Sequence, residues 1–171
     1  RVLTVGNHIP GKEPSAILKA VSLVECELTV VGQGPLSESL RLQSLKLGIT
    51  HKVTFLPSVP NSELHSIYQQ HDVFCISIRY PGVCIPVLEA MSSGLPVIVN
   101  QPLWEKTPEF IGSDAVVVEN TGKGYGTAIE KLYRKPELRK KIGAANRQKV
   151  MQVDSTKMEE KEAVLFKKLI G

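Results

Sequence analysis

Short apolar runs rich in β-branched residues alternate with longer amphipathic segments along the whole chain. An apolar run of this length, bounded by turn residues, predicts a buried strand, and each amphipathic segment predicts a helix. The predicted strands occupy residues 2–5, 27–31, 52–56, 73–77, 96–99 and 115–119. The predicted helices occupy residues 13–24, 36–47, 62–70, 85–93, 124–150 and 155–169.

This alternation predicts the fold class. Strands joined by crossover helices form a parallel sheet, so we expect an α/β, doubly wound, Rossmann-like fold with six strands and helices on both faces. No repeat or linker interrupts the pattern, and residues 1–171 are expected to form a single domain. Ligands of such sheets bind beyond the carboxyl ends of the strands, where the strand order reverses. The loops after the first four strands are therefore the candidates for a binding site.

The composition is that of an ordinary globular domain, with 42% hydrophobic and 22% charged residues. No apolar run approaches the ~20 residues needed to span a membrane. The formal net charge is +4, and positive charge is densest in residues 133–141. This run is either a solvated helix face or a peripheral contact with anionic lipid headgroups. No nucleic-acid partner is expected, because only 5% of the residues are aromatic.

The cysteines and histidines indicate neither a metal site nor a disulfide framework. Cys26, Cys75 and Cys84 are widely spaced and odd in number, and no C-x-x-C pair is present. The four histidines lack the spacing of metal ligands, and no D-x-D motif occurs. We therefore expect no metal and no cofactor. Reduced cysteines suit a reducing compartment, so a cytoplasmic protein is expected, with the inner face of a membrane as the alternative location.

Two glycines follow the second predicted strand, in "VVGQGP". Gly32 and Gly34 fit the first two positions of a dinucleotide-binding G-x-G-x-x-G motif, but Ser37 stands at the third. A tight turn that needs glycine dihedral angles is the favoured interpretation. An NAD-binding domain stays open as an alternative.

The loop "PGVCIP" leads into the fourth predicted helix and is a candidate anion site. Gly82 lets the backbone approach a ligand, and the N–H groups from Val83 to Val87 lie at the start of the helix. Such amides, together with the helix dipole, favour an anion such as a phosphate. The alternative is that Pro81 and Gly82 only form a turn and that Pro86 is an ordinary first-turn proline.

Glu89 lies about one turn into this helix, between Leu88 and Ala90. A carboxylate in apolar surroundings is costly unless something binds it, and this one is placed to accept hydrogen bonds from the vicinal hydroxyls of a ribose. Phosphate on the amides and ribose on the acid together indicate a nucleotide. Lys12, in the loop after the first strand, is within reach of the same phosphates. The alternatives are a solvated or lysine-paired rim glutamate and a solvated lysine.

These residues lie in motifs that resemble a known family. "VVGQGP", "VTFLPSVP", "SELHSIYQQHDVF" and "GVCIPVLEAMSSGLPVIV" resemble the C-terminal, nucleotide-sugar-binding domain of the retaining "glycosyl transferases group 1" family, which has two facing Rossmann-like domains (the GT-B fold). "TPEFI" and "KPELRKKIGAANRQKV" resemble later blocks of the family. The resemblance covers nearly the whole chain. It implies that this donor domain is the C-terminal half of a longer chain with an N-terminal acceptor domain.

The resemblance also implies roles for individual residues. It assigns catalytic roles to Lys12, at the donor diphosphate, and Glu89, at the nucleotide ribose. It places the base beside residues 55–60. It places the donor against Gly6, Asn7, Gly82, Val83, Cys84, Ile85, Val87, Leu88 and Glu89.

Two positions depart from the family pattern. Asn7 stands where the family has an arginine that contacts the diphosphate, and Pro81 stands where it has a glutamate that touches the transferred sugar. Loss of a preorganised positive charge weakens stabilisation of the leaving diphosphate, and Arg79 beside the loop is the candidate to compensate. The resemblance implies a retaining glycosyltransferase that moves a sugar from a nucleoside diphosphate sugar to an acceptor hydroxyl. The alternative is a degenerate, non-catalytic nucleotide-binding or partner subunit of the same fold.

Overall fold

The structure, a computed structural model, describes residues 1–12, 14–79, 84–100 and 114–152. Its strands form one parallel sheet in the order β3-β2-β1-β4-β5-β6. They are β1 (Val2–Val5), β2 (Leu28–Val31), β3 (Val53–Leu56), β4 (Val73–Ile76), β5 (Val97–Asn100) and β6 (Val116–Val118). The predicted six-stranded, doubly wound α/β fold is confirmed.

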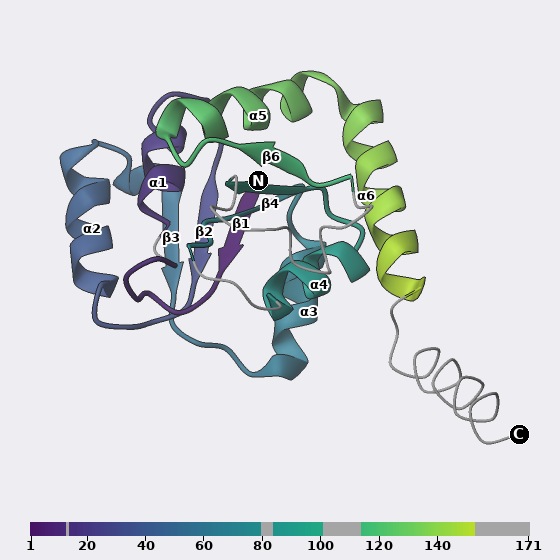
Figure 1. Ribbon diagram of the computed structural model, residues 1–171. Helices are drawn as coiled ribbons and strands as arrows, with labels where there is room; N and C mark the ends of the chain where they lie inside the picture. The colour runs from purple at the N-terminus through teal and green to yellow at the C-terminus, as the bar shows by residue number, and fades with distance from the viewer. Residues whose placement is uncertain (13, 80–83, 101–113, 153–171) are drawn as a thin grey trace, which may run out of the picture.

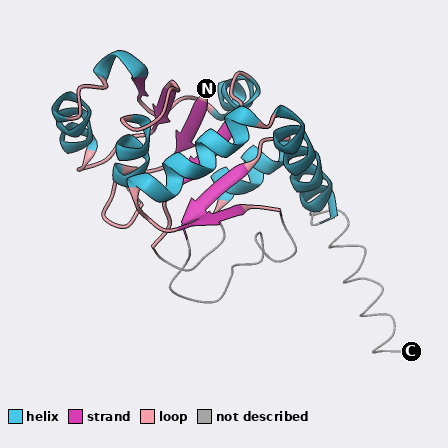
Figure 2. Ribbon diagram, turned by 90° about the horizontal axis from the view of Figure 1, so that it is seen from above, coloured by secondary structure: helices cyan, strands magenta, loops and turns pink. Residues whose placement is uncertain are grey.

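Helices connect the strands and cover both faces of the sheet (Figure 1). Figure 2 shows the same arrangement from above, with the strands between the helices. A short 3-10 turn, η1 (Thr50–Lys52), precedes β3. The helices are α1 (Ser15–Val21), α2 (Ser37–Lys46), α3 (Asn61–Gln69), α4 (Ile85–Ser92), α5 (Gly122–Arg134) and α6 (Pro136–Gln152).

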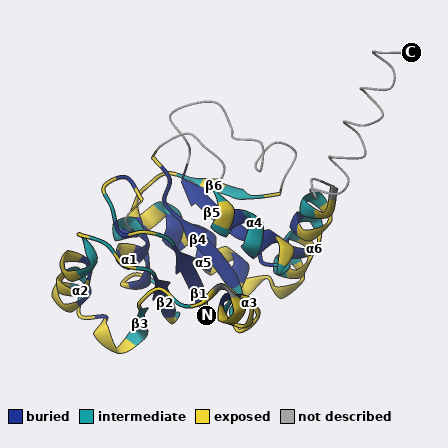
Figure 3. Ribbon diagram, turned by 90° about the horizontal axis from the view of Figure 1, so that it is seen from below, coloured by how far each residue is buried: buried dark blue, intermediate teal, exposed yellow. Residues whose placement is uncertain are grey.

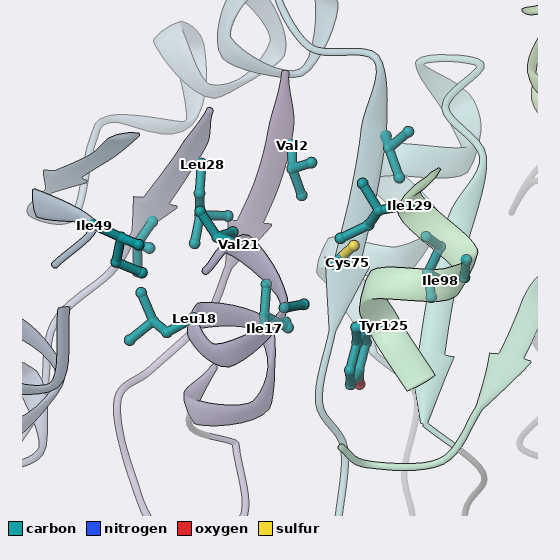
Figure 4. Close-up of a cluster of buried hydrophobic side chains, with 14 of the residues drawn as sticks. Val2, Ile17, Leu18, Val21, Leu28, Ile49, Cys75, Ile98, Tyr125 and Ile129 are labelled. Atoms are coloured by element: carbon teal, nitrogen blue, oxygen red, sulfur yellow. The ribbon is translucent and has the colours of Figure 1, made fainter. Parts of the chain in front are cut away.

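The central strands are buried on both faces, as their continuous apolar runs predict. Every residue of β1, β4 and β5 is buried, whereas the outward sides of the helices are exposed (Figure 3). One face of the sheet packs against α1, α2 and α5, with a core that includes Ile17, Leu18, Tyr125 and Ile129 (Figure 4). The opposite face packs against α3 and α4, through residues such as Tyr68, Val87 and Met91.

One predicted helix is two helices in the structure. The sequence predicted a continuous helix over 124–150, but α5 ends at Arg134 and α6 begins at Pro136. Lys135 between them has φ −125° and ψ 74°, outside the helical region. The proline ring disfavours a helical conformation of the residue before it, while proline fits the first position of a new helix. The helix predicted over 155–169 lies outside the described residues.

The basic run 133–141 spans this junction. Arg134 pairs with Glu130 at 2.7 Å and Lys140 with Glu137 at 3.2 Å, all on exposed helix surface. These pairs favour the solvated helix face over the lipid contact, which stays a prediction. Within the described residues, no helix combines the length and apolar character needed to cross a membrane.

The strand order reverses at β1, which has β2 on one side and β4 on the other. From β1 the chain adds β2 and β3 toward one edge of the sheet, and it then returns to β4 and adds β5 and β6 toward the other edge. Loops diverge at such a point, and the crevice between them is the usual ligand site of an open parallel sheet. The fold therefore directs attention to the carboxyl ends of β1 and β4.

Candidate functional site

A cavity of about 340 Å³ opens at the reversal of the strand order. The ends of β1 and β4, the loop after β1 and the first turn of α4 line it. Five residues that the sequence analysis assigned to the donor site lie on its wall: Gly6, Asn7, Lys12, Cys84 and Ile85. Residues from two distant parts of the sequence thus meet at one cavity because their strands are neighbours.

The loop after β1 is held against the loop after β2 by backbone contacts. The His8 N–H donates to Gln33 O at 3.1 Å, and the Leu36 N–H donates to His8 O at 3.0 Å. Gly32 has φ +136°, and a side-chain carbon at Gly34 would lie 2.5 Å from His8 O. Both glycines therefore serve the turn and its close approach to the neighbouring loop, as the favoured interpretation predicted.

His8 is a residue of this site to which the sequence alone assigned no role and no partner. It is buried and lines the cavity, with Nδ1 2.8 Å from Ser37 Oγ, which also accepts the Gly34 N–H at 2.9 Å. Its Nε2 has no hydrogen-bond partner within the described residues. Burial, and then the charge of Arg41, lower the pKa of His8. Ser37, which breaks the dinucleotide motif, thus fixes the histidine ring.

Because the pKa of His8 is lowered in the folded chain, the free energy of unfolding decreases as the solution becomes more acidic. Below about pH 6.5 the unfolded chain takes up this proton more readily than the folded chain, so stability declines as the pH falls toward the lower, folded pKa. His71, whose pKa burial also lowers, contributes in the same direction. We expect His8→Gln to flatten the decline in urea-derived unfolding free energy between about pH 7 and pH 5. The exposed His51→Gln is the control, and an unchanged slope in His8→Gln would contradict this prediction.

Lys12 and Asn7 supply the polar groups at the mouth of the cavity. Both are exposed, and Lys12 forms no ion pair with any described residue. An unpaired ammonium group beside a cavity is available to an anionic ligand as a point charge. Asn7 has an uncharged amide at the position where the resemblance implies arginine, so the cavity has one cation fewer than that pattern implies.

The start of α4 forms another part of the cavity wall, and here the prediction of free backbone amides was partly wrong. Val87 N–H and Leu88 N–H donate to Cys84 O at 3.0 and 3.3 Å, so these amides are used within the helix. The Val87 side chain belongs to the core, and neither residue lines the cavity. Pro86 has no N–H group, which leaves Ile85 N–H as an amide without a partner in the described part of the chain. The sequence predicted an anion site on the amides from Val83 to Val87, and the resemblance added Leu88. Among the described residues, the amides left for an anion are confined to the very start of α4.

Glu89 is half-buried on α4, and its Oε2 accepts a hydrogen bond from the Tyr68 hydroxyl at 2.9 Å. The same hydroxyl lies 3.3 Å from Pro86 O. Burial, and then the charge of Glu89, raise the pKa of Tyr68 well above its usual value, so the phenol stays protonated and donates. Glu89 does not line the main cavity. It lines a second cavity of about 100 Å³ between α3 and α4, with Leu64, His65, Tyr68, Ser92 and Ser93.

Three residues assigned or discussed at the sequence level, Pro81, Gly82 and Val83, lie outside the described residues. Of the described residues, Cys26, Cys75 and Cys84 are unbridged. In the same set, no three or more His, Cys, Asp or Glu side chains cluster as metal ligands do. The polar groups at the described cavities include the Lys12 ammonium, the Asn7 amide, the imidazole of His8, the start of α4 and the Glu89 carboxylate.

The fold and site define a class of protein: a Rossmann-like domain whose cavity at the strand-order reversal is flanked by a lysine and a helix N-terminus. Within that class, residues 1–149 match the family "Glycosyl transferases group 1", and the chain belongs to this family.

Known proteins similar to the chain include both enzymes of known sequence and solved structures. It is 26% identical to the GDP-mannose-dependent alpha-(1-6)-phosphatidylinositol monomannoside mannosyltransferase of Mycolicibacterium smegmatis, over 85% of this chain and 42% of that protein. Sucrose-phosphate synthase from Thermosynechococcus elongatus superposes with a TM-score of 0.81 at 20% identity, over 99% of this chain and 45% of that one. The pneumococcal O-GlcNAc transferase in complex with UDP and GlcNAc gives 0.81 at 19%, over 99% and 35%.

These comparisons have different weight. The two structural similarities, at 20% and 19% identity, show the fold alone. The chain spans less than half the length of each of the three proteins. The family is thus shown, and the activity, substrates and partners of the whole protein are matters for proposal.

Proposed function

We propose that the chain is the donor-binding domain of a retaining glycosyltransferase, which transfers a sugar from a nucleoside diphosphate sugar to an acceptor hydroxyl. The observation that carries this proposal is the placement of three groups around the first turn of α4. Lys12 and Ile85 line the main cavity, and Glu89, one turn further along α4 than Ile85, lines the second cavity. Family membership and the UDP found in the pneumococcal structure support the same ligand class.

In this proposal the diphosphate occupies the main cavity. Negative charge grows on the leaving diphosphate as its bond to the sugar breaks, and preorganised positive groups stabilise that charge. Lys12 supplies a full charge, while the Ile85 N–H and the dipole of α4 supply a partial one. The proposal assigns this electrostatic role to the lysine and the helix, with no metal or further cofactor.

The nucleoside ribose lies against Glu89. A carboxylate has about four acceptor positions, and the Tyr68 hydroxyl uses one of them on Oε2. The remaining positions accept hydrogen bonds from two vicinal hydroxyls. Because Tyr68 already fixes the carboxylate, little rotamer freedom is lost when the nucleotide binds.

The rest of the enzyme is part of the same proposal. An acceptor domain that precedes this domain in a longer, cytoplasmic chain completes the cleft in which transfer occurs. The 171-residue chain is therefore expected to bind the donor without transferring its sugar.

Asn7 favours a second candidate function. Its neutral side chain lines the cavity where the resemblance implies a charge-assisted phosphate contact, and such contacts are among the stronger hydrogen bonds. A degenerate, nucleotide-binding subunit that does not transfer sugar fits this substitution. Binding of a nucleotide sugar by the full-length protein, without transfer or hydrolysis across a broad acceptor panel, would favour this candidate.

A thermal-shift screen of nucleoside diphosphates and their sugars tests the proposed ligand class. A ligand that binds only the folded chain stabilises it by about 2.7 kcal/mol at about 100 times its Kd, so the correct nucleotide is expected to stand out. Titration calorimetry then measures its Kd. Stabilisation by NAD, with none by uridine, guanosine or adenosine diphosphate, would contradict the proposal and support the dinucleotide alternative.

A further inference from the structure

Asn100, the last residue of β5, holds the backbone of one residue through both atoms of its side-chain amide. Its Oδ1 accepts the Ile78 N–H at 2.6 Å, and its Nδ2 donates to Ile78 O at 2.7 Å. Asn100 is only 6% exposed, so water does not compete for these bonds. No sequence motif singled out this residue.

The two bonds continue the sheet beyond the end of its backbone ladder. The strand pairing of β4 with β5 runs from Phe74 and Val97 to Ile76 and Val99. The Asn100 side chain reaches Ile78, two residues past the end of β4. It therefore takes over the role that backbone groups play along the strand.

Ile78 is a wall residue of the main cavity, as is Ser77 beside it. The next residue, Arg79, donates its N–H to Gly11 O at 3.0 Å, and Gly11 directly precedes Lys12. Asn100 thus fixes a segment that both lines the cavity and contacts the loop that carries the lysine. A displacement of Ile78 would change the width of the cavity and the position of Lys12 together.

Asparagine is well suited to this contact among the common side chains. The contact needs one donor and one acceptor on a short planar group, and a primary amide supplies both. Aspartate keeps the acceptor but places a second acceptor against Ile78 O, and serine has a single hydroxyl. Because the site is buried, loss of one partner leaves a backbone group without a hydrogen bond, which is costly.

We propose that Asn100 is a positioning residue of the donor site. By holding Ile78, it sets the distance between the Ile78 wall of the cavity and the loop that carries Lys12, and a diphosphate needs this distance to fit between them. This inference rests on the proposed function, because it assumes that the main cavity holds the diphosphate. Among the described residues, Asn100 is not part of the cavity lining, and the proposed role is exercised through the backbone of Ile78.

The test compares the affinity of the 171-residue chain for two ligands that differ by one phosphate. The ligands are the tightest-binding of uridine, guanosine and adenosine diphosphate and the matching monophosphate. Asn100→Asp is expected to raise the Kd of the diphosphate by about tenfold and that of the monophosphate by less. The ratio of the two Kd values is the decisive readout, because partial unfolding raises the apparent Kd of both ligands by the same factor. Asn100→Ser serves as a second variant if the aspartate variant does not fold.

Asn146→Asp is the matched control. Asn146 is likewise buried and donates to a backbone oxygen, Leu95 O at 3.2 Å, but it does not line the main cavity. Its variant is expected to lose stability and keep the wild-type Kd ratio. An unchanged ratio in a folded Asn100 variant would overturn the inference and leave the proposed function standing. A wild-type chain that binds none of the three diphosphates would overturn both.

Discussion

Replacement of Glu89 by alanine is expected to raise the Kd for the bound nucleoside diphosphate by about tenfold or more, with the fold retained. The substitution removes the charged acceptor of the ribose hydroxyls, and hydrogen bonds to charged groups are stronger than neutral ones. It also leaves the Tyr68 hydroxyl without its 2.9 Å partner, which costs stability and not affinity. Titration calorimetry measures the Kd, and circular dichroism establishes that the variant is folded.

Glu130→Ala is the control for this substitution. Glu130 is an exposed glutamate on α5, paired with Arg134 on the far side of the sheet from α4. Its variant is expected to bind like the wild type, because exposed ion pairs contribute little. A Glu89→Ala chain with the wild-type Kd would remove Glu89 from the site, whatever the control shows.

Lys12→Ala is expected to raise the Kd of the same diphosphate by about tenfold at low salt. Lys12 is unpaired among the described residues and lines the main cavity, so its charge is available to the phosphates. Because salt screens exposed charges, the difference between variant and wild type is expected to shrink as ionic strength rises. Calorimetry at two salt concentrations measures this change.

Lys46→Ala, on the exposed last turn of α2, changes the net charge by the same amount as Lys12→Ala. It is expected to leave the Kd unchanged at both salt concentrations. Equal losses in the two variants would mean that the overall charge of the chain attracts the nucleotide. Such a result would contradict a specific contact with Lys12.

The strands could be predicted from the sequence because a parallel sheet covered on both faces makes its strands apolar throughout. β1, β4 and β5 are buried at every residue, and each appears in the sequence as a short apolar run. The break between α5 and α6 was missed because the helical pattern was extended across Pro136. The non-helical conformation of Lys135 shows that the constraint of proline prevailed.

The candidate site could be predicted only in part. Lys12, Cys84 and Ile85 could be placed together because loops at the carboxyl ends of neighbouring strands converge. The start of α4 at residue 85 was predicted correctly, but the Val87 and Leu88 amides were taken as free for a ligand. The carbonyl of Cys84, the residue before the helix, accepts both N–H groups, so only the amides nearest the helix start remain for a ligand.

The contacts that shape the site could not be predicted, because they join residues distant in the sequence. His8 meets Ser37 across 29 positions, Tyr68 meets Glu89 across 21, and Asn100 meets Ile78 across 22. Periodicity reports which side of an element is buried and not which polar atoms meet there. Tyr68 lies in one of the motifs that resemble the family, and this was the one signal that pointed to it.

A crystal structure of the chain with its tightest-binding nucleoside diphosphate tests the central claim most directly. We expect the phosphates in the main cavity, within hydrogen-bond distance of Lys12 Nζ and Ile85 N, and the ribose hydroxyls on the carboxylate of Glu89. A nucleotide bound elsewhere, or one whose ribose does not contact Glu89, would contradict it.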